Sequence, residues 1–131
     1  MPKRTIETKF YEFRQNNSGG RFDVDENLAH HVWIEAGSLP EAVAKAEDIG
    51  IYFNGCASGR DCDCCGDRWS EPWSDNGHTE EEMRAEIESN RKGGYDRWTD
   101  PAVYIHFYDG TKEAVPSSDN RYIDKKRQFN G

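Results

Sequence analysis

The sequence predicts an α+β domain: an antiparallel sheet of about four to five strands, two helices and a Cys-rich loop. Three observations carry this prediction. Segments rich in β-branched and aromatic residues occur near both ends of the chain. Two segments with helix start and stop signals lie between them. The order is strands, helix, Cys-rich loop, helix and hairpin, which favours an antiparallel sheet with its helices on one face.

The N-terminal part of the chain is predicted to form strands. Residues 6–14 (IETKFYEFR) carry aromatic residues at odd and even positions, which indicates a strand covered on both sides. Residues 15–20 (QNNSGG) are typical of a turn. Residues 21–25 alternate between apolar and polar side chains, and residues 30–36 (HHVWIEA) are largely apolar. Each of these two segments therefore predicts a further strand.

Two helices are expected next. The first begins at Ser38, where SLPE fits a capping box, and ends near Gly50, a typical residue after a helix. The second begins at Thr79, where TEEE fits the same motif, and ends at Gly93. Acidic residues in its first turn and basic residues in its last turn complement the helix dipole.

A β-hairpin is predicted close to the C-terminus. Residues 102–108 (AVYIHFY) have a strong strand pattern, and residues 111–115 return as the partner strand. Asp109 and Gly110 between them favour a two-residue type I′ turn. The hairpin completes the predicted sheet.

The length of 131 residues favours one domain. We place it at residues 1–115 and expect residues 116–131 to form a polar tail that frays. Apolar residues make up only 34% of the chain, so the core is expected to depend on its sixteen aromatic side chains.

The chain carries a net charge of −8. Binding to duplex nucleic acid depends on neutralising phosphates, so no such partner is expected. No secretory signal and no run of about 18 apolar residues is present, so we expect a cytoplasmic protein without a membrane partner.

The four cysteines lie within ten residues of the segment NGCASGRDCDCCGDRWS (54–70). Cys62 and Cys65 have the CxxC spacing of zinc ligands, and Gly66 permits the tight turn that such a pair requires. One such pair is half a site, for which Cys56 or Cys64 is a third candidate ligand. The candidates for the fourth ligand are His30, His31, His78 and His106. Zinc is therefore a candidate cofactor.

Other interpretations of the cysteines stay open. Reduced thiols that pack a tight loop explain them about as well as zinc does. A disulfide is disfavoured in the cytosol, and no cysteine-protease signature is present. Asp61, Asp63 and Gly66 imitate the start of a calcium-binding EF-hand loop, but Pro72 stands where that loop needs a glutamate.

Polar residues of two segments predict a ligand site. In the turn RQNNSGGR, arginine, amide and hydroxyl groups would bind an anionic or nucleotide-like ligand, and GDRW adds an arginine and a tryptophan on which a base could stack. The alternatives are an ordinary hairpin turn, an arginine paired with a neighbouring acid, and a core tryptophan. The candidate ligand-binding residues are Arg14, Asn16, Asn17, Ser18, Arg68 and Trp69.

The strings FYEFRQNNSGGRF, VWIEA, AEDIGIYFNG and GRDCDCCGDRW, within residues 10–70, resemble a family of small proteins of tailed bacteriophages, especially T4-like ones. The resemblance implies a viral protein that acts in the cytoplasm of the infected bacterium, and it supplies no reaction or catalytic residue. Small phage accessory proteins often counter host defence or redirect host machinery.

Three functions follow as expectations. The first is a non-enzymatic binding protein that sequesters a nucleotide-like host defence signal, with homo-oligomerisation as one way to join two polar clusters. The second is a zinc-stapled acidic module that binds a host protein, since an acidic surface steers towards a basic partner. The third is a small hydrolase, for which the sequence shows acid–base groups at no recognised spacing.

Overall fold

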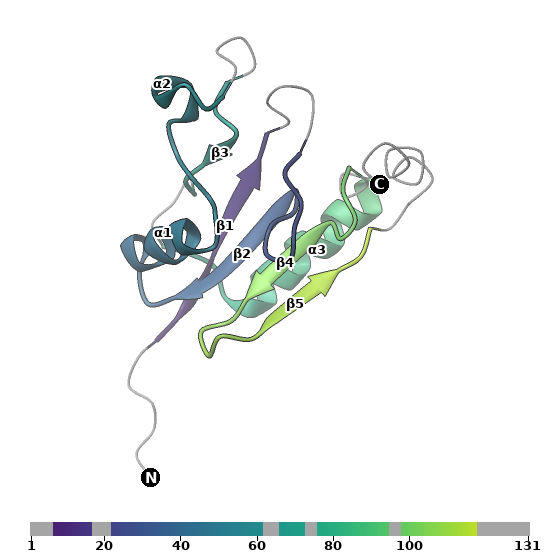
Figure 1. The fold of residues 1–131 in the computed structure, drawn as a ribbon. Coiled ribbons are helices and arrows are strands. Elements are labelled where there is room, and N and C mark those ends of the chain that lie inside the picture. The colour runs from purple at the N-terminus through teal and green to yellow at the C-terminus, as the bar shows by residue number, and fades with distance from the viewer. Residues whose placement is uncertain (1–6, 17–21, 62–65, 73–75, 95–97, 118–131) are drawn as a thin grey trace.

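The computed structural model describes residues 7–16, 22–61, 66–72, 76–94 and 98–117, and it has the predicted α+β fold (Figure 1). One sheet of five strands has the order β3-β1-β2-β4-β5. The strands are β1 (Lys9–Gln15), β2 (His31–Ala36), β3 (Trp69–Ser70), β4 (Val103–His106) and β5 (Lys112–Val115). The helices are α1 (Leu39–Asp48), α2 (Gly55–Ser58) and α3 (Glu80–Gly93).

The sheet is mostly antiparallel. Strand β1 pairs antiparallel with β2 and β3, and β4 pairs antiparallel with β5. The exception is the central pair, in which β2 and β4 run parallel. Parallel neighbours need a long crossover, and here the segment between them contains all three helices and β3.

Helix α1 covers one face of the sheet. Its buried residues Ala42 and Ala46 pack in one cluster with side chains of alternate positions on β1 and β2, among them Phe13, Val32 and Ile34. Alternate residues of a strand point to the same face. The helix begins where predicted, because Ser38 accepts a hydrogen bond from the backbone N–H of Glu41 at 3.4 Å.

Helix α3 covers the opposite face, as Figure 1 shows. Met83 and Ile87 pack there against Phe10, Trp33 and Ile105. The expectation that both helices share one face is therefore wrong, whereas the cover predicted on both sides of β1 is confirmed. Aromatic residues at odd and even positions of β1 require an apolar neighbour on each face of the sheet. Helix α1 supplies this neighbour on one face, and α3 supplies it on the other.

Two predicted turns differ in detail. Helix α3 ends at Gly93 as expected, but the residue that caps it is Gly94, whose φ of 77° places it in the left-handed region favoured by glycine. The hairpin loop has three residues and not two, because Phe107 donates its N–H to the carbonyl of Thr111 at 2.8 Å. Gly110 has a φ of 92° and Asp109 is not left-handed, so the type I′ geometry is absent there.

The strand predicted over residues 21–25 is wrong for its described part, residues 22–25, which form a loop. The side chain of Gln15 takes the place of a partner strand. Its Nε2 donates to the carbonyls of Asp23 at 3.0 Å and Ala29 at 2.9 Å, and its Oε1 accepts from the N–H of Asp23. Asp25 then accepts from the N–H of Leu28 at 2.9 Å, which closes the loop.

Candidate ligand-binding site

The ladder of backbone hydrogen bonds along the outer edge of β1, the edge away from β2, is interrupted. Arg14 pairs with Ser70 of β3, and Phe10 forms an isolated bridge with His78. Four steps along β1 separate Arg14 from Phe10, but eight steps separate Ser70 from His78. The outer segment therefore cannot follow β1 continuously, and it leaves Glu12 in the middle of the gap.

Pro72 explains where β3 ends. Continued in the same register, the pairing of Arg14 with Ser70 would set Pro72 opposite Glu12. A proline has no backbone N–H and cannot donate a ladder bond to a neighbouring strand. The carbonyl of Glu12 therefore has no ladder donor at this position, and pairing stops after Ser70.

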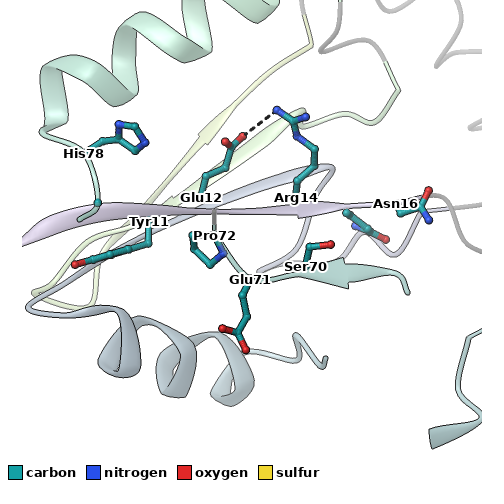
Figure 2. A pocket seen from close by; sticks show the side chains of 10 residues that line it. Tyr11, Glu12, Arg14, Asn16, Ser70, Glu71, Pro72 and His78 are labelled. Atoms are coloured by element: carbon teal, nitrogen blue, oxygen red, sulfur yellow. Dashed lines mark ion pairs between the residues drawn. The ribbon is translucent and has the colours of Figure 1, made fainter. Parts of the chain in front are cut away.

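A cleft of about 380 Å³ lies along this gap. We call it the β1 cleft, and Figure 2 shows its lining. Strand β1 divides it: Glu12, Arg14 and His78 point to the side of α3, and Tyr11 and Pro72 point to the other side. The lining residues are Tyr11, Glu12, Arg14, Gln15, Asn16, Ser70, Glu71, Pro72, Gly77 and His78.

Glu12 is a charged group of the β1 cleft that two neighbouring side chains hold in place. Its Oε2 lies 3.0 Å from Nδ1 of the buried His31 and 3.7 Å from a guanidinium nitrogen of Arg14. Burial opposes its ionisation, but the hydrogen bond from His31 and the charges of His31 and Arg14 outweigh burial and hold the pKa of Glu12 below its usual value. The side chain is therefore a carboxylate at neutral pH, which can only accept hydrogen bonds.

His78 closes the cleft at the end near α3. Its backbone exchanges two hydrogen bonds with Phe10, at 2.7 and 2.8 Å. Its ring meets Trp33 edge to face at 5.7 Å and lies 3.6 Å from a carboxylate oxygen of Glu82. The side chain is about half exposed. Trp33 and Glu82 thus orient the ring, while one side of the ring stays open to a ligand.

The structure brings the two predicted polar segments together. Asn16 donates its backbone N–H to the carbonyl of Arg68 at 2.6 Å, so the turn after β1 lies beside the GDRW segment. Arg14 and Asn16 line the β1 cleft, and the side chain of Arg14 is 58% exposed. The other two residues predicted in the turn, Asn17 and Ser18, lie outside the described residues.

Arg68 is placed inside the fold and not at the cleft. Its side chain is only 8% exposed, and its Nε lies 3.8 Å from Asp61 and 3.4 Å from Asp23. The same Nε donates to the hydroxyl of Tyr52 at 3.2 Å, and Nη1 donates to Gln15 at 3.4 Å. The guanidinium that was predicted to hold phosphate therefore fastens the Cys-rich segment to the loop that precedes β2.

Trp69 is also internal. It is 2% exposed and packs in the α1-side core with Phe13 and Ile51. The open stacking surface that the GDRW motif suggested is absent at this position, because β3 turns the indole towards α1. A second tryptophan considered for stacking, Trp73, lies outside the described residues.

The family comparison now has a structural context. A family model, described as Domain of unknown function (DUF7296), matches residues 8–123. The chain belongs to this family. Neither the curated proteins nor the solved structures contain a significant match. The DUF7296 match contains all five strands and all three helices, and therefore both sides of the β1 cleft.

The Cys-rich loop of this DUF7296 chain is described only at its base. The metal ligands predicted at Cys62, Cys64 and Cys65 lie outside the described residues. Cys56 lies on α2, and its backbone N–H donates to Asp67 at 2.9 Å. Within the ranges that the structure describes, no three metal-binding side chains converge. Zinc thus stays a prediction.

Sequence reasoning missed Glu12, Ser70, Glu71 and His78 as lining residues of the β1 cleft. Ser70 and Glu71 directly precede a proline, which is a recognisable signal for the end of an edge strand. The alternation along β1 could also have set Glu12 and Arg14 on one face. That His78 returns to the same edge depends on a register that the sequence does not reveal.

Proposed function

We propose that this protein is a phage-encoded, non-enzymatic binding protein that takes a nucleotide-like ligand in the β1 cleft. In the cytoplasm of the infected bacterium it would sequester a nucleotide-like host defence signal. The observation that carries the proposal is the mixture of groups in the cleft. Arg14, Asn16 and Ser70 supply donors, and Glu12 and Glu71 supply acceptors.

The size and charge of the β1 cleft narrow the ligand. A volume of about 380 Å³ lies at the lower end of the range for small-molecule sites, which suits a nucleoside or a mononucleotide. Among the described lining residues, Arg14 is the one Lys or Arg, beside two glutamates. This balance favours the base and sugar as the recognised parts, with no more than one phosphate at the guanidinium of Arg14.

Binding is favoured over catalysis by the position of the Glu12–His31 pair at the cleft. A general base needs an atom within hydrogen-bond reach of its substrate. His31 is bonded to Glu12 through Nδ1, but its Nε2 is buried and has no hydrogen-bond partner among the described residues. His31 also does not line the cleft, so this pair supports the carboxylate and does not offer a base to a ligand.

Calorimetry with purified protein tests this function. We expect at least one nucleoside or mononucleotide from a panel of the common bases to bind, and Arg14→Ala to weaken the mononucleotide more than the nucleoside. Arg60→Ala is the matched control, because Arg60 is an exposed arginine outside the cleft that lies over the ring of Tyr52. Absence of binding for the whole panel at saturating concentrations would reject the proposal.

An acidic interaction module is the second candidate, and the outer surface of α3 favours it. The helix directs Met83 and Ile87 to the sheet and leaves five glutamates exposed. A basic host protein would be the partner, with zinc at Cys62 and Cys65 as a staple. Elemental analysis tests the staple: one equivalent of zinc supports it, and less than a tenth of an equivalent with titratable thiols rejects it. The exposed glutamates are Glu80, Glu81, Glu82, Glu86 and Glu88.

A further inference from the structure

The backbone of Glu12 faces the β1 cleft. In an antiparallel pair, successive residues direct their N–H and C=O groups alternately to the two neighbouring strands. Gln15 donates its N–H to His30 on the β2 side, whereas the N–H groups of Phe10 and Asn16 point outwards, to His78 and Arg68. Glu12 has the same parity as Phe10 and Asn16, so its N–H and C=O also point outwards.

These two backbone groups have no hydrogen-bond partner among the described residues. Phe10 and Asn16, on either side along the same edge, are bonded at 2.7 and 2.6 Å. Glu12 has no such bond to any described residue, because Pro72 ends the neighbouring strand and the next described pairing along this edge is that of Phe10 with His78. A donor and an acceptor that belong to one residue thus lie side by side at the wall of a cleft of about 380 Å³.

The gap admits a group of defined shape. It is closed by the Ser70 pair on one side and by the His78 bridge on the other. With respect to the described residues, only one residue of β1 is open, and an added peptide strand would not fit. The N–H and C=O of one extended residue pair with an acceptor and a donor that lie next to each other in one plane. In a β-ladder, the opposite residue presents these two groups. A lactam, in which N–H and C=O are adjacent in a ring, offers this pair.

We propose that the backbone of Glu12 binds the lactam edge of a guanine-type nucleobase. The inference rests on the proposed function and names the part of the ligand that is recognised. The Glu12 N–H donates to the ring carbonyl, and the Glu12 C=O accepts from the ring N–H. Guanine carries a further amino group beside its lactam, whereas uracil carries a second carbonyl there.

The acidic lining explains the choice of guanine. Glu12 is ionised at neutral pH, Glu71 is exposed at the cleft, and a carboxylate can only accept hydrogen bonds. An amino group beside the lactam therefore finds an acceptor, while a second carbonyl would meet negative charge. Arg14 lines the same cleft and would bind the sugar or one phosphate.

Amide exchange measured by NMR tests the inference directly. In the free protein we expect the Glu12 amide to exchange quickly, and the Phe10 and Asn16 amides, which are bonded along the same edge, to exchange slowly. Guanosine is expected to slow the exchange of Glu12 at least tenfold and to leave unchanged that of Phe10, which does not line the β1 cleft. The comparison ligand is 1-methylguanosine, which keeps the ring carbonyl and the amino group but lacks the ring N–H.

Three outcomes decide the matter. Binding of guanosine with slower Glu12 exchange, together with at least tenfold weaker binding of 1-methylguanosine, supports the inference. If guanosine binds but Glu12 exchange does not change, or the methylated nucleoside binds equally well, the inference is overturned and the proposed function stands. If neither guanosine nor any other nucleoside or nucleotide binds, both proposals are overturned.

Discussion

Arg68 shows how the same residue type can serve a ligand or the fold. The N–H donors of its guanidinium suggested an anion-binding site. In the structure, the carboxylates of Asp23 and Asp61 of the chain itself occupy the place of the anion. Asp61 is fully buried and also accepts from Tyr52 at 2.6 Å and from the backbone N–H of Arg68 at 2.7 Å. A buried charge needs such partners, since an unpaired one is very costly.

Replacing Arg68 with methionine should therefore destabilise the protein strongly. The change leaves Asp61 buried without its cation, and breaking a buried pair in this way costs about 3–5 kcal/mol. Urea unfolding measures the loss. Arg60→Met is the control and should cost less than about 1 kcal/mol, because that side chain is exposed. The double change Arg68→Met with Asp61→Asn should cost less than the sum of the two single changes; additive losses would show that the two residues are not coupled.

His30 makes the stability sensitive to acid. Burial, with the positive charges of His31 and Arg14, lowers the pKa of His30 from 6.5 to about 3. Between these values the unfolded chain binds a proton that the folded chain does not bind, so the free energy of unfolding falls as the pH falls from about 6.5 towards about 3. Burial lowers the pKa of His106 too, and its effect has the same sign.

The variant His30→Phe should flatten this dependence, because it keeps an aromatic ring against Phe22 and cannot be protonated. Between pH 7 and pH 5 the unmodified protein should lose up to about 2 kcal/mol more than the variant, as measured by urea unfolding at both pH values. An equal slope for His30→Phe and the unmodified protein would contradict the prediction.

At the scale of elements, local signals predicted most of the fold. Ser38 and Thr79 cap α1 and α3 at the expected residues, and apolar periodicity located β1, β2, β4 and β5. Features that depend on partners distant in sequence were not predictable. The loop at residues 22–25 follows from hydrogen bonds to one buried glutamine, and the β1 cleft follows from the register between β1 and the segment after Pro72.

Helix α2 depends on a glycine at its first position. A Cβ on Gly55 would lie 1.9 Å from Oδ2 of Asp61 and 2.8 Å from the ring of Tyr52. Neither side chain can move freely, because they are bonded to one another at 2.6 Å. The base of the Cys-rich loop is therefore closed too tightly for any side chain at this position.

Gly55→Ala should lower the free energy of unfolding by about 2 kcal/mol or more, in the upper part of the range for overpacked sites. Gly59→Ala is the matched control four residues later. Nothing lies within 4 Å of its Cβ, so only the left-handed backbone, with a φ of 85°, should add a cost of about 1 kcal/mol. Equal losses for the two variants, measured by urea unfolding, would show that the contact with Asp61 does not matter.

At the scale of the whole molecule, the parallel pair β2–β4 joins the two halves of the chain. His31 pairs with Val103, and Trp33 pairs with Ile105. The face that α3 covers is built on strands from both sides of this junction, with Phe10 and Trp33 on one side and Val103 and Ile105 on the other. In the described part of the chain, no helix is long and apolar enough to cross a membrane.

A chain that ends before Val103 should therefore not fold cooperatively. It lacks Val103 and Ile105, two of the buried side chains on which the α3-side core depends, and it leaves β2 as an edge. A chain that ends at Ser117 keeps the five strands and should show one cooperative urea transition. Near-ultraviolet circular dichroism compares the two. A cooperative transition in the shorter chain would contradict this account of the core.

Pro72 has a consequence for contacts between molecules. An open strand edge is a template on which neighbouring molecules can add strands and aggregate. Along the outer edge of β1, as far as the chain is described, the ladder is open at one residue only, with paired residues before and after it. A foreign strand needs several consecutive bonds to dock, whereas a small planar molecule needs two. The same proline that opens the edge to a small molecule thus keeps it too short for amyloid-like growth.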